Sequence, residues 1–300
     1  MQSSAPSQAG TVSPALPPVE LFRRYWPWLL PLAPLVYLLW GPVQWAWVTW
    51  SAPDSPQAYQ PLVLPGALVL AWVRRREIQA AYEATKAGKK GGLWLTVLGV
   101  VLMVLAHGTQ MASVSAVALI IIIAGVIYYM YGKVVLRALR TPLLFLFTMV
   151  PLPGFVVDQP TQVLQIASTK AAGHIMERLH IPTLVQGNTI ITPKYTVEVA
   201  IACSGVGILL PLLVMTLWLL LMMEGSLGRK LFLLFVGFWI ALAVNVLRIT
   251  SMGLMGQFDA DVANMLHDSN SWIFTALAFY LTYLAARALG ITKLCSPSSS

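Results

Sequence analysis

Three residues of the 300-residue chain have types that together could transfer an acyl group: Cys203, Arg248 and His267. A cysteine nucleophile needs a nearby base, and a fixed cation can stabilise the oxyanion that forms when a carbonyl is attacked. Sequence spacing alone leaves a second interpretation open for each residue. A lone cysteine in an apolar helix is usually a small hydrophobic residue, a histidine at a helix start is usually solvated, and an arginine at a membrane boundary usually extends to head groups.

The neighbours of these residues favour the chemical interpretation. Cys203 is predicted to begin a helix, where the positive end of the helix dipole stabilises a thiolate. Ser204 and Gly205 are small and would let a substrate approach closely. Asn245 lies three residues before Arg248, hence on the same helical face, where it could orient the guanidinium. A serine nucleophile at Ser204 would have no better partners than Cys203.

Composition places these residues in a membrane protein. Hydrophobic residues make up 58% of the chain and charged residues 10%, against about 25% charged in a soluble domain. The net charge of +8 comes from short basic clusters between apolar runs, which is the pattern that fixes membrane orientation. The bilayer is therefore the expected partner, and nucleic acid is not.

A membrane-spanning helix needs about 20 apolar residues, and the sequence offers about eight such stretches. The expected spans are 26–48, 57–73, 91–107, 112–132, 141–157, 203–223, 231–249 and 271–289. Residues 1–20 are rich in Ser, Pro and Ala and are predicted to be a disordered cytoplasmic tail. Spans one to four fall within 21–140, spans five to eight within 141–290, and 291–300 form a second cytoplasmic tail.

Charge placement gives these spans an orientation. With the N-terminus inside, the outer segments hold only Lys170, Arg178, Lys194 and Arg248 of the 19 basic residues, and the other fifteen face the cytoplasm. This bias follows the positive-inside rule. Cys203, Arg248 and His267 then share the outer face, whereas Cys295 lies in the cytoplasmic tail, so the two cysteines cannot form a disulfide.

The outer segment 158–202 is the one long connection between spans. Apolar residues from Leu164 to Leu179 recur at spacings of three and four, which predicts an amphipathic helix at the interface. Thr183–Gln186 and Thr189–Thr192 flank Gly187-Asn188, which predicts a small β-hairpin. The predicted fold is an all-α polytopic membrane protein with this helix and hairpin between helices five and six. No cluster has metal-ligand spacing and no phosphate loop is present, so no metal or cofactor is expected.

The runs around the three residues resemble the motifs of the exosortase/archaeosortase family. Glu198-Val199-Ala200-Ile201-Ala202-Cys203-Ser204-Gly205 is similar to its cysteine motif, Asn245-Val246-Leu247-Arg248-Ile249 to its arginine motif, and Leu266-His267-Asp268 to its histidine motif. Residues 149–153 and 185–187 resemble the segments that precede them. The resemblance covers about 140–290, an exosortase-like catalytic core. Residues 206–208 differ from the bulkier or basic residue of many members, which leaves the subfamily open.

The resemblance implies a membrane-embedded cysteine protease or transpeptidase with sortase-like activity. Such enzymes are thought to recognise exported proteins by a C-terminal sorting signal, which is a short motif, a transmembrane helix and a basic tail. Cys203 would form a thioester with the substrate, Arg248 would stabilise the oxyanion, and His267 would shuttle the proton. The substrate would pass to an acceptor that the sequence does not identify, or to water. The supporting residues would be Asn245, Ser204 and Glu198.

The charge placement predicts an inner-membrane protein with both termini in the cytoplasm and the active site outside. The rival interpretation is a non-catalytic permease or polysaccharide-assembly subunit. Transporters usually place polar groups at the bilayer midplane, whereas the polar residues here gather at one end of the spans. That distribution favours the enzyme.

Overall fold

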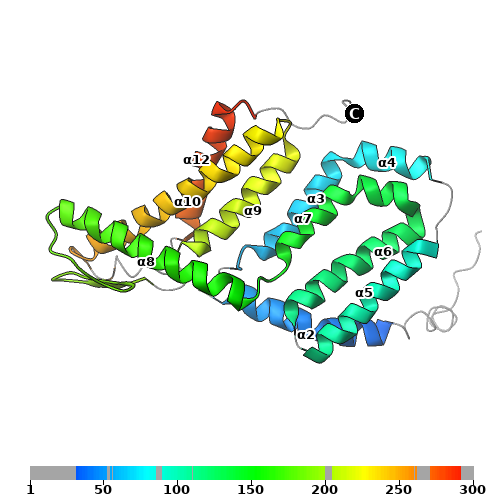
Figure 1. Cartoon of the computed structure of the whole chain (residues 1–300), viewed down its shortest axis with the longest axis horizontal. Helices are drawn as coiled ribbons and strands as arrows, with labels where there is room; N and C mark the ends of the chain where they lie inside the picture. The colour runs from blue at the N-terminus through cyan, green and yellow to red at the C-terminus, as the bar shows by residue number, and fades with distance from the viewer. Residues whose placement is uncertain are drawn as a thin grey trace, which may run out of the picture.

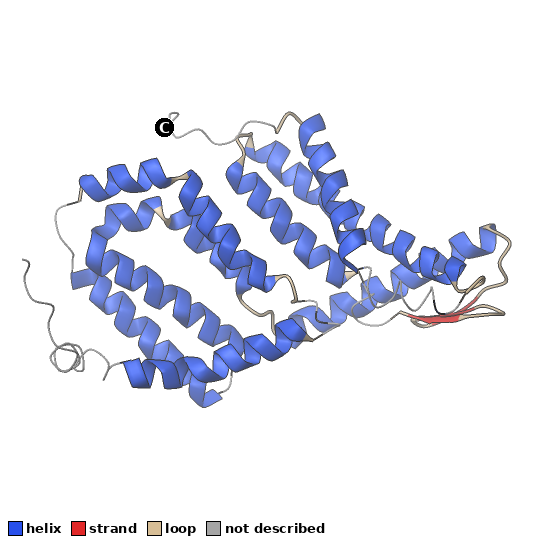
Figure 2. Cartoon of the chain, turned by 180° about the vertical axis from the view of Figure 1, so that it is seen from behind, coloured by secondary structure: helices blue, strands red, loops and turns tan. Residues whose placement is uncertain are grey.

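The computed structural model describes residues 32–52, 55, 57–85, 90–109, 111–199, 205–259, 261 and 271–291. Within these ranges the chain is mostly helical with one small β-sheet (Figures 1 and 2). The predicted tail 1–20, most of the tail 291–300 and the start of the first expected span lie outside them. Three predicted site residues, Cys203, Ser204 and His267, also lie outside the described residues.

The described elements fall into two groups along the chain. The first group is α2 (Leu32–Ser51), η1 (Gln60–Leu62), α3 (Val63–Val73), α4 (Arg75–Glu83), α5 (Lys90–Thr109), α6 (Ala112–Ala138), α7 (Arg140–Leu146) and η2 (Phe147–Met149). The second group is α8 (Gly154–Arg178), β1 (Leu184–Gln186), β2 (Thr189–Ile191), β3 (Thr196–Glu198), α9 (Val206–Met222), α10 (Leu227–Met255) and α12 (Ser271–Ala288). Figure 1 shows the two groups side by side, with α9 facing α3 and α7 across the boundary.

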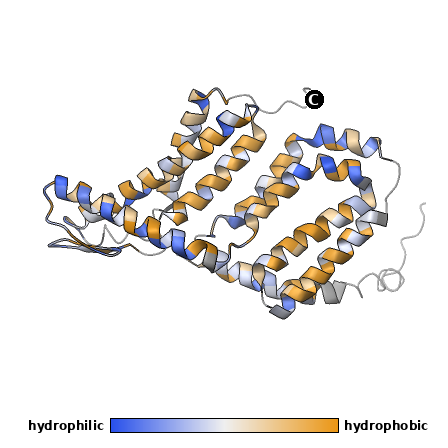
Figure 3. Cartoon of the chain, in the orientation of Figure 1, coloured by the Kyte–Doolittle hydropathy of each residue, from blue (hydrophilic) through white to orange (hydrophobic). Residues whose placement is uncertain are grey.

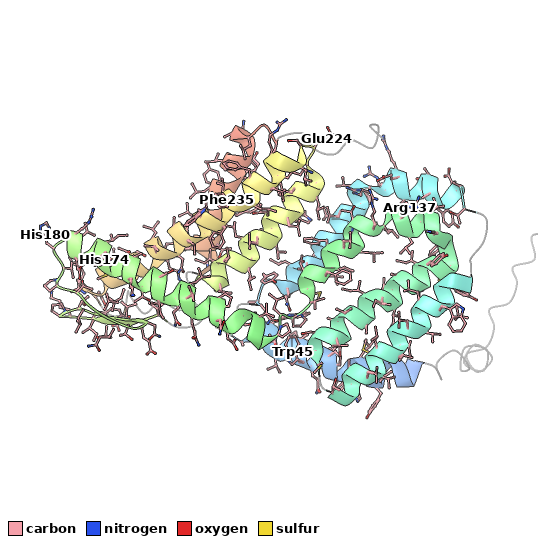
Figure 4. All side chains as sticks on the ribbon, viewed as in Figure 1. Trp45, Arg137, His174, His180, Glu224 and Phe235 are labelled. Carbon is pink, nitrogen blue, oxygen red and sulfur yellow. The ribbon has the colours of Figure 1, made fainter. Side chains whose placement is uncertain are left out.

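Helices α5, α6 and α10 are long and apolar enough to cross a membrane. Only 22% of the apolar stretch of α5, 22% of that of α6 and 39% of that of α10 is buried inside the protein. Large apolar side chains therefore face outward, such as Trp94 on α5 and Phe235 on α10 (Figure 4). A surface this apolar requires lipid rather than water as its solvent. The chain is a membrane protein.

The other expected spans differ in length from the described helices. The segments Gln60–Val73, Val206–Met222 and Trp272–Ala288 are apolar helices shorter than 18 residues. The expected span 141–157 is not one helix, because η2 ends at Met149 and α8 begins at Gly154. Pro151 and Pro153 explain this break, since proline cannot donate the backbone hydrogen bond that would continue the helix. Within the described residues the structure thus shows three helices that are long and apolar enough to cross a membrane, and the predicted count of eight spans is not confirmed.

Close packing holds α5 and α6 together as a helical hairpin. A Cβ atom added to Gly125 would lie 2.6 Å from the backbone nitrogen of Thr96, and one added to Gly99 would lie 2.9 Å from that of Ile122. Small residues at such positions let two helix backbones approach in a membrane. Helix α6 also bends at Gly132, whose φ of 83° is not helical. The bend turns the chain back toward α7.

Helices α9, α10 and α12 form a three-helix bundle. Their buried apolar side chains meet at a cluster formed by Ile208, Leu209, Leu212, Ala241, Val244 and Ala278. Two basic residues at the start of α10 close one end of the bundle. Lys230 donates to the carbonyls of Leu220 and Met223 at 2.7 Å, and Arg229 donates to that of Leu289 at 3.3 Å. These cations satisfy the last carbonyls of α9 and the α12 C-terminal turn.

The three strands and α8 cover the opposite end of α10. The sheet is antiparallel with the order β1-β2-β3, and Gln186 pairs with Thr189 across the turn Gly187-Asn188. Ala172 and Met176 of α8, Val197 and Val199 near β3, and Ile249 and Met252 of α10 belong to one buried cluster. We call this end of the molecule the sheet end. The end with the α9–α10 connection, α4 and the α6–α7 junction is called the turn end (Figure 1).

Helices α3 and α7 join the two groups through α9. Val63, Ala67, Leu70 and Phe145 form a buried cluster against which Trp218 of α9 packs. The indole nitrogen of Trp218 donates to the Gly66 carbonyl at 2.9 Å. This bond satisfies a polar indole inside an apolar contact, so it fixes how α9 lies on α3.

Candidate active site at the sheet end of helix α10

Arg248 is the largest side chain that the protein buries almost completely. Its exposed fraction is 2%, and it lies on α10 between Val244 and Ile249, which are both buried. Among the residues that the structure describes, its Nε and Nη1 atoms have no hydrogen-bond partner. An arginine is always charged, and burying an unpaired charge is costly. A guanidinium in this position has at least two nitrogen donors available to bind a carbonyl or an oxyanion.

Asn245 is fully buried one turn before Arg248 on α10. It lies against Gly205, the residue that precedes α9: a Cβ added to Gly205 would be 3.2 Å from Asn245 Nδ2. Gly205 has a φ of 100°, which glycine adopts without the penalty that a side chain would bring. The sequence predicted that Asn245 lies on the same helical face as Arg248. It did not predict that Asn245 meets the turn that begins α9.

The chain just before the predicted nucleophile is held by two amide side chains. The Val199 carbonyl accepts a hydrogen bond from Gln165 Nε2 of α8 and another from Asn188 Nδ2 at 3.2 Å. The Val199 backbone nitrogen donates to the Asn188 carbonyl at 2.9 Å. Sequence reasoning missed these two contacts, because Gln165 belongs to no recognisable motif and Asn188 was recognised only as part of a turn. A Gly-Asn pair predicts a turn, but not what the asparagine side chain will reach.

The described residues on either side of segment 200–204, which contains Cys203, are held in place. Val199 is tied to α8 and to the hairpin turn, and Gly205 rests on α10. The Gly205 carbonyl accepts from the backbone nitrogens of Ile208 and Leu209, so it begins α9. Both attachment points lie at the sheet end, next to the part of α10 that carries Arg248.

The remaining predicted site residues occupy different positions. Glu198 is exposed on β3, whereas its neighbours Val197 and Val199 are buried toward α10. It therefore lies on the face of the strand that is turned away from Val197 and Val199. His267 lies outside the described residues, four positions before α12 begins at Ser271, and α12 packs on α9 and α10.

Three of the four histidines are described, and each is placed elsewhere. The His107 ring contacts Tyr37 near the end of α5, with ring centroids 5.1 Å apart. His174 is exposed on α8, where its Nδ1 lies 3.3 Å from Glu177, and His180 follows the end of α8 (Figure 4). His267, the fourth histidine, lies outside the described residues. Among the described residues, no group of three His, Cys, Asp or Glu side chains could hold a metal ion.

A bundle of apolar helices with a buried arginine toward one end defines a helical membrane protein. The transmembrane exosortase model matches residues 47–284, which is most of the chain, and the chain belongs to that family. The match extends well upstream of the motifs around Cys203, Arg248 and His267, so α5 and α6 are part of the family's common region. No curated protein and no solved structure matches the chain.

Proposed function

We propose that this protein is a membrane cysteine transpeptidase or peptidase whose active site lies at the sheet end of α10. Cys203 attacks a peptide carbonyl of the substrate, the carbon–nitrogen bond breaks, and a thioester joins the acyl part to the sulfur. His267 takes the thiol proton and gives it to the departing amine. An acceptor nucleophile or water then attacks the thioester, and the returning thiolate recovers a proton.

The observation that carries this proposal is the buried guanidinium of Arg248. A buried cation keeps its donors in a fixed direction and in a low dielectric, where a developing negative charge gains most from them. The guanidinium is also planar, so it can direct two hydrogen bonds at one oxygen-bearing group. Arg248 is suited to stabilise the oxyanion that forms when Cys203 attacks.

Chain connectivity supports the pairing of Cys203 with Arg248. Cys203 is two residues before Gly205, and two Cα–Cα steps cover at most about 7 Å. Gly205 rests on Asn245, and Arg248 follows one turn later, about 4.5 Å along the helix axis. A long arginine side chain can reach across that interval.

The proposed substrates are exported proteins that end in a sorting signal. The family membership supports this class of substrate, and the resemblance of the motifs supports a signal made of a short peptide, a membrane helix and a basic tail. In the proposed orientation the sheet end faces the outside of the inner membrane. The short peptide would approach Cys203 beside α8 and the sheet, while its helix remains in lipid.

The experiment is processing of a tagged sorting-signal protein in membranes that contain the full chain. Such a reporter is chosen from the host's exported proteins that share a C-terminal motif, helix and basic tail. Cys203→Ala should abolish processing at normal protein abundance, and Cys295→Ser, the matched control at the other cysteine, should leave it unchanged. Retained processing with Cys203→Ala would overturn the mechanism and return the chain to the non-catalytic alternative.

A second variant separates the two chemical steps. His267→Ala should impair turnover, because the imidazole moves the proton in both steps. If a thioester on Cys203 accumulates, His267 acts mainly when the acceptor attacks. If no thioester forms, it acts mainly in forming the thiolate. Normal turnover of His267→Ala would remove the histidine from the mechanism.

A further inference from the structure

An apolar groove lies between helix α7 and the α5–α6 hairpin, away from the candidate active site. It is lined by Leu95 of α5, by Ile121 and Ala124 of α6, and by Leu143 and Leu144 of α7. Every lining side chain is apolar except Arg140. We propose that this groove binds one acyl chain of an anionic membrane phospholipid, with Arg140 at its head group.

The bend in α6 explains why the groove exists. Gly132 departs from helical geometry, and a Cβ there would lie 2.7 Å from Thr85 Cγ2, which would obstruct the bend. After the bend the chain returns through α7, which is only seven residues long before η2. A short helix that meets a long one near a bend leaves the space beside the long helix unfilled.

The lining of the groove favours a hydrocarbon chain. The empty volume of the groove is about 600 Å³, and part of that space is open to the surroundings of the protein. A linear acyl chain is narrow enough to lie along such a groove, and an apolar lining is the surrounding that such a chain prefers.

The depth of the groove fits a lipid of one leaflet. Along α7 and η2 the lining runs from Arg140 to Phe147, a rise of about 10 Å for helical residues. One leaflet of hydrocarbon is about 15 Å thick. A head group held at Arg140 therefore leaves the first half of its acyl chain, or somewhat more, inside the groove.

Charge at the mouth of the groove selects the head group. Lys133, Arg137 and Arg140 are exposed within eight residues of sequence, and α4 packs on α6 with exposed Arg75 and Arg76. Lys133, Arg137 and Arg140 form no ion pair with any residue in the described part of the chain. Figure 3 shows hydrophilic residues along α4 and the α6–α7 junction, above the hydrophobic lengths of α5 and α6. A cationic rim over an apolar groove matches an anionic amphiphile.

The position of the groove separates this lipid from the proposed reaction. Arg140 lies at the turn end, whereas Arg248 lies toward the sheet end, where α8 and the strands cover α10 (Figures 1 and 2). The lipid therefore belongs to the leaflet opposite the candidate active site and does not meet Cys203. It would fill the space beside α6 and fix α7, on which α3 and α9 pack.

Native mass spectrometry of the full chain in detergent tests the proposal. Phosphatidylglycerol and phosphatidylcholine with identical acyl chains are added in competition. The wild type should retain one phosphatidylglycerol in preference to phosphatidylcholine. Arg140→Gln should weaken phosphatidylglycerol binding about fivefold, as expected for one basic residue at an anionic surface, and leave phosphatidylcholine binding unchanged. Arg178→Gln, an exposed basic residue at the end of α8, is the matched control and should change neither.

The apolar half of the proposal has its own variants. Ala124→Phe places a ring in the groove and should abolish binding of both lipids. Because that variant could disturb folding, the wild type is also labelled with phosphatidylglycerol carrying a photoreactive acyl chain. Crosslinks should map to Ile121, Leu143 or Leu144. Equal binding of the two lipids, or crosslinks only on other helices, would overturn the proposal. A dimer that Ala124→Phe dissociates would show instead that a second copy occupies this face.

Discussion

Gly205 and Asn245, forty residues apart in the sequence, are in such close contact that a single added carbon on Gly205 would lie 3.2 Å from Asn245 Nδ2. The contact joins the start of α9 to the part of α10 that carries Arg248. It therefore couples Gly205, which is two residues after Cys203 in the sequence, to the part of α10 that carries the guanidinium. A change on either side of the contact should alter the proposed acyl transfer more than it alters the stability of the protein.

The first prediction concerns Gly205→Ala. The new Cβ crowds Asn245, and a φ of 100° costs a residue with a side chain about 1–2 kcal/mol. We expect processing of the tagged substrate to fall at least tenfold, because small misplacements of reacting groups are expensive. The measurements are processing rate and thermal unfolding of the purified chain.

Gly187→Ala provides the control for backbone strain alone. Gly187 also has a positive φ, 61°, but nothing lies within 4 Å of a Cβ added there. Its effect on unfolding should resemble that of Gly205→Ala, while its processing rate should stay near that of the wild type. Equal processing rates in the two variants would mean that the Gly205–Asn245 contact does not position the site.

The second prediction concerns Arg248→Lys. An ammonium carries the same charge but lacks the planar, fixed set of donors. Loss of one preorganised oxyanion donor slows a reaction roughly 10²–10³-fold, and we expect thioester formation to slow by that factor at normal protein abundance. Near-normal processing would show that Arg248 needs only its charge, as a residue that extends to lipid head groups would.

Arg248→Met distinguishes a functional arginine from a structural one. Replacing a buried charge by an apolar side chain of similar volume is often neutral or stabilising, by up to about 4 kcal/mol. We expect processing to be lost while the unfolding temperature stays constant or rises. A large fall in unfolding temperature would assign the guanidinium to holding α10 in place.

Sequence reasoning identified the buried arginine because an isolated cation in an apolar run is chemically conspicuous. Arg248 breaks the charge pattern of the spans, and the structure places it almost fully out of solvent. The Gly187-Asn188 pair likewise predicted the position of the turn between β1 and β2. Local signals of this kind depend on a few neighbouring residues, so they can be recognised without knowledge of the fold.

Other features depend on contacts between distant segments and were not predictable. Gln165 reaches Val199 across 34 residues, and neither residue carries a signal of its own. The expected span 141–157 was wrong for a related reason. An apolar run such as 141–157 has the composition of a membrane helix, but Pro151 and Pro153 divide it and α8 continues as a separate helix. Hydropathy averages over such a break.

The third prediction concerns membrane sidedness. Gln257 Nε2 donates to Thr192 Oγ1 at 2.7 Å, so the end of α10 and the strand region must lie on the same side. A reporter enzyme that is active only outside the cytoplasm should be active when it is fused after Thr192 or after Gln257. A second reporter, which is active only in the cytoplasm, should be active when it is fused after Ser226, because α10 begins at the other end of the molecule.

The structure also fixes which reporters must agree. Arg229 donates to Leu289, so the α9–α10 connection and the end of α12 share one side. Reporters after Ser226 and after Leu289 should therefore give the same result. Cytoplasmic activity of the reporter after Thr192 would place the proposed site on the wrong side of the membrane for exported substrates.

The fourth prediction concerns Gln165 as a positioning residue. Gln165 lies on α8, and its side chain donates a hydrogen bond to the carbonyl of Val199. Val199 is four residues before Cys203 in the sequence. Gln165→Ala should leave α8 folded, because the backbone hydrogen bonds of the helix do not depend on that side chain. We expect processing to slow about 10- to 100-fold, the range in which misplacement of a reacting group by about 1 Å falls.

The readout that isolates positioning is the reactivity of Cys203 toward a membrane-impermeant maleimide. If Gln165 holds the segment, Gln165→Ala should change the labelling rate of Cys203 along with processing, and Gln165→Asn should restore neither, because its shorter side chain does not reach Val199. Gln257→Ala is the matched control, since it removes an amide hydrogen bond between α10 and Thr192 at the same end of the molecule. It should alter the unfolding temperature more than the labelling rate. Unchanged processing and labelling in Gln165→Ala would show that segment 200–204 is held without the bond to α8.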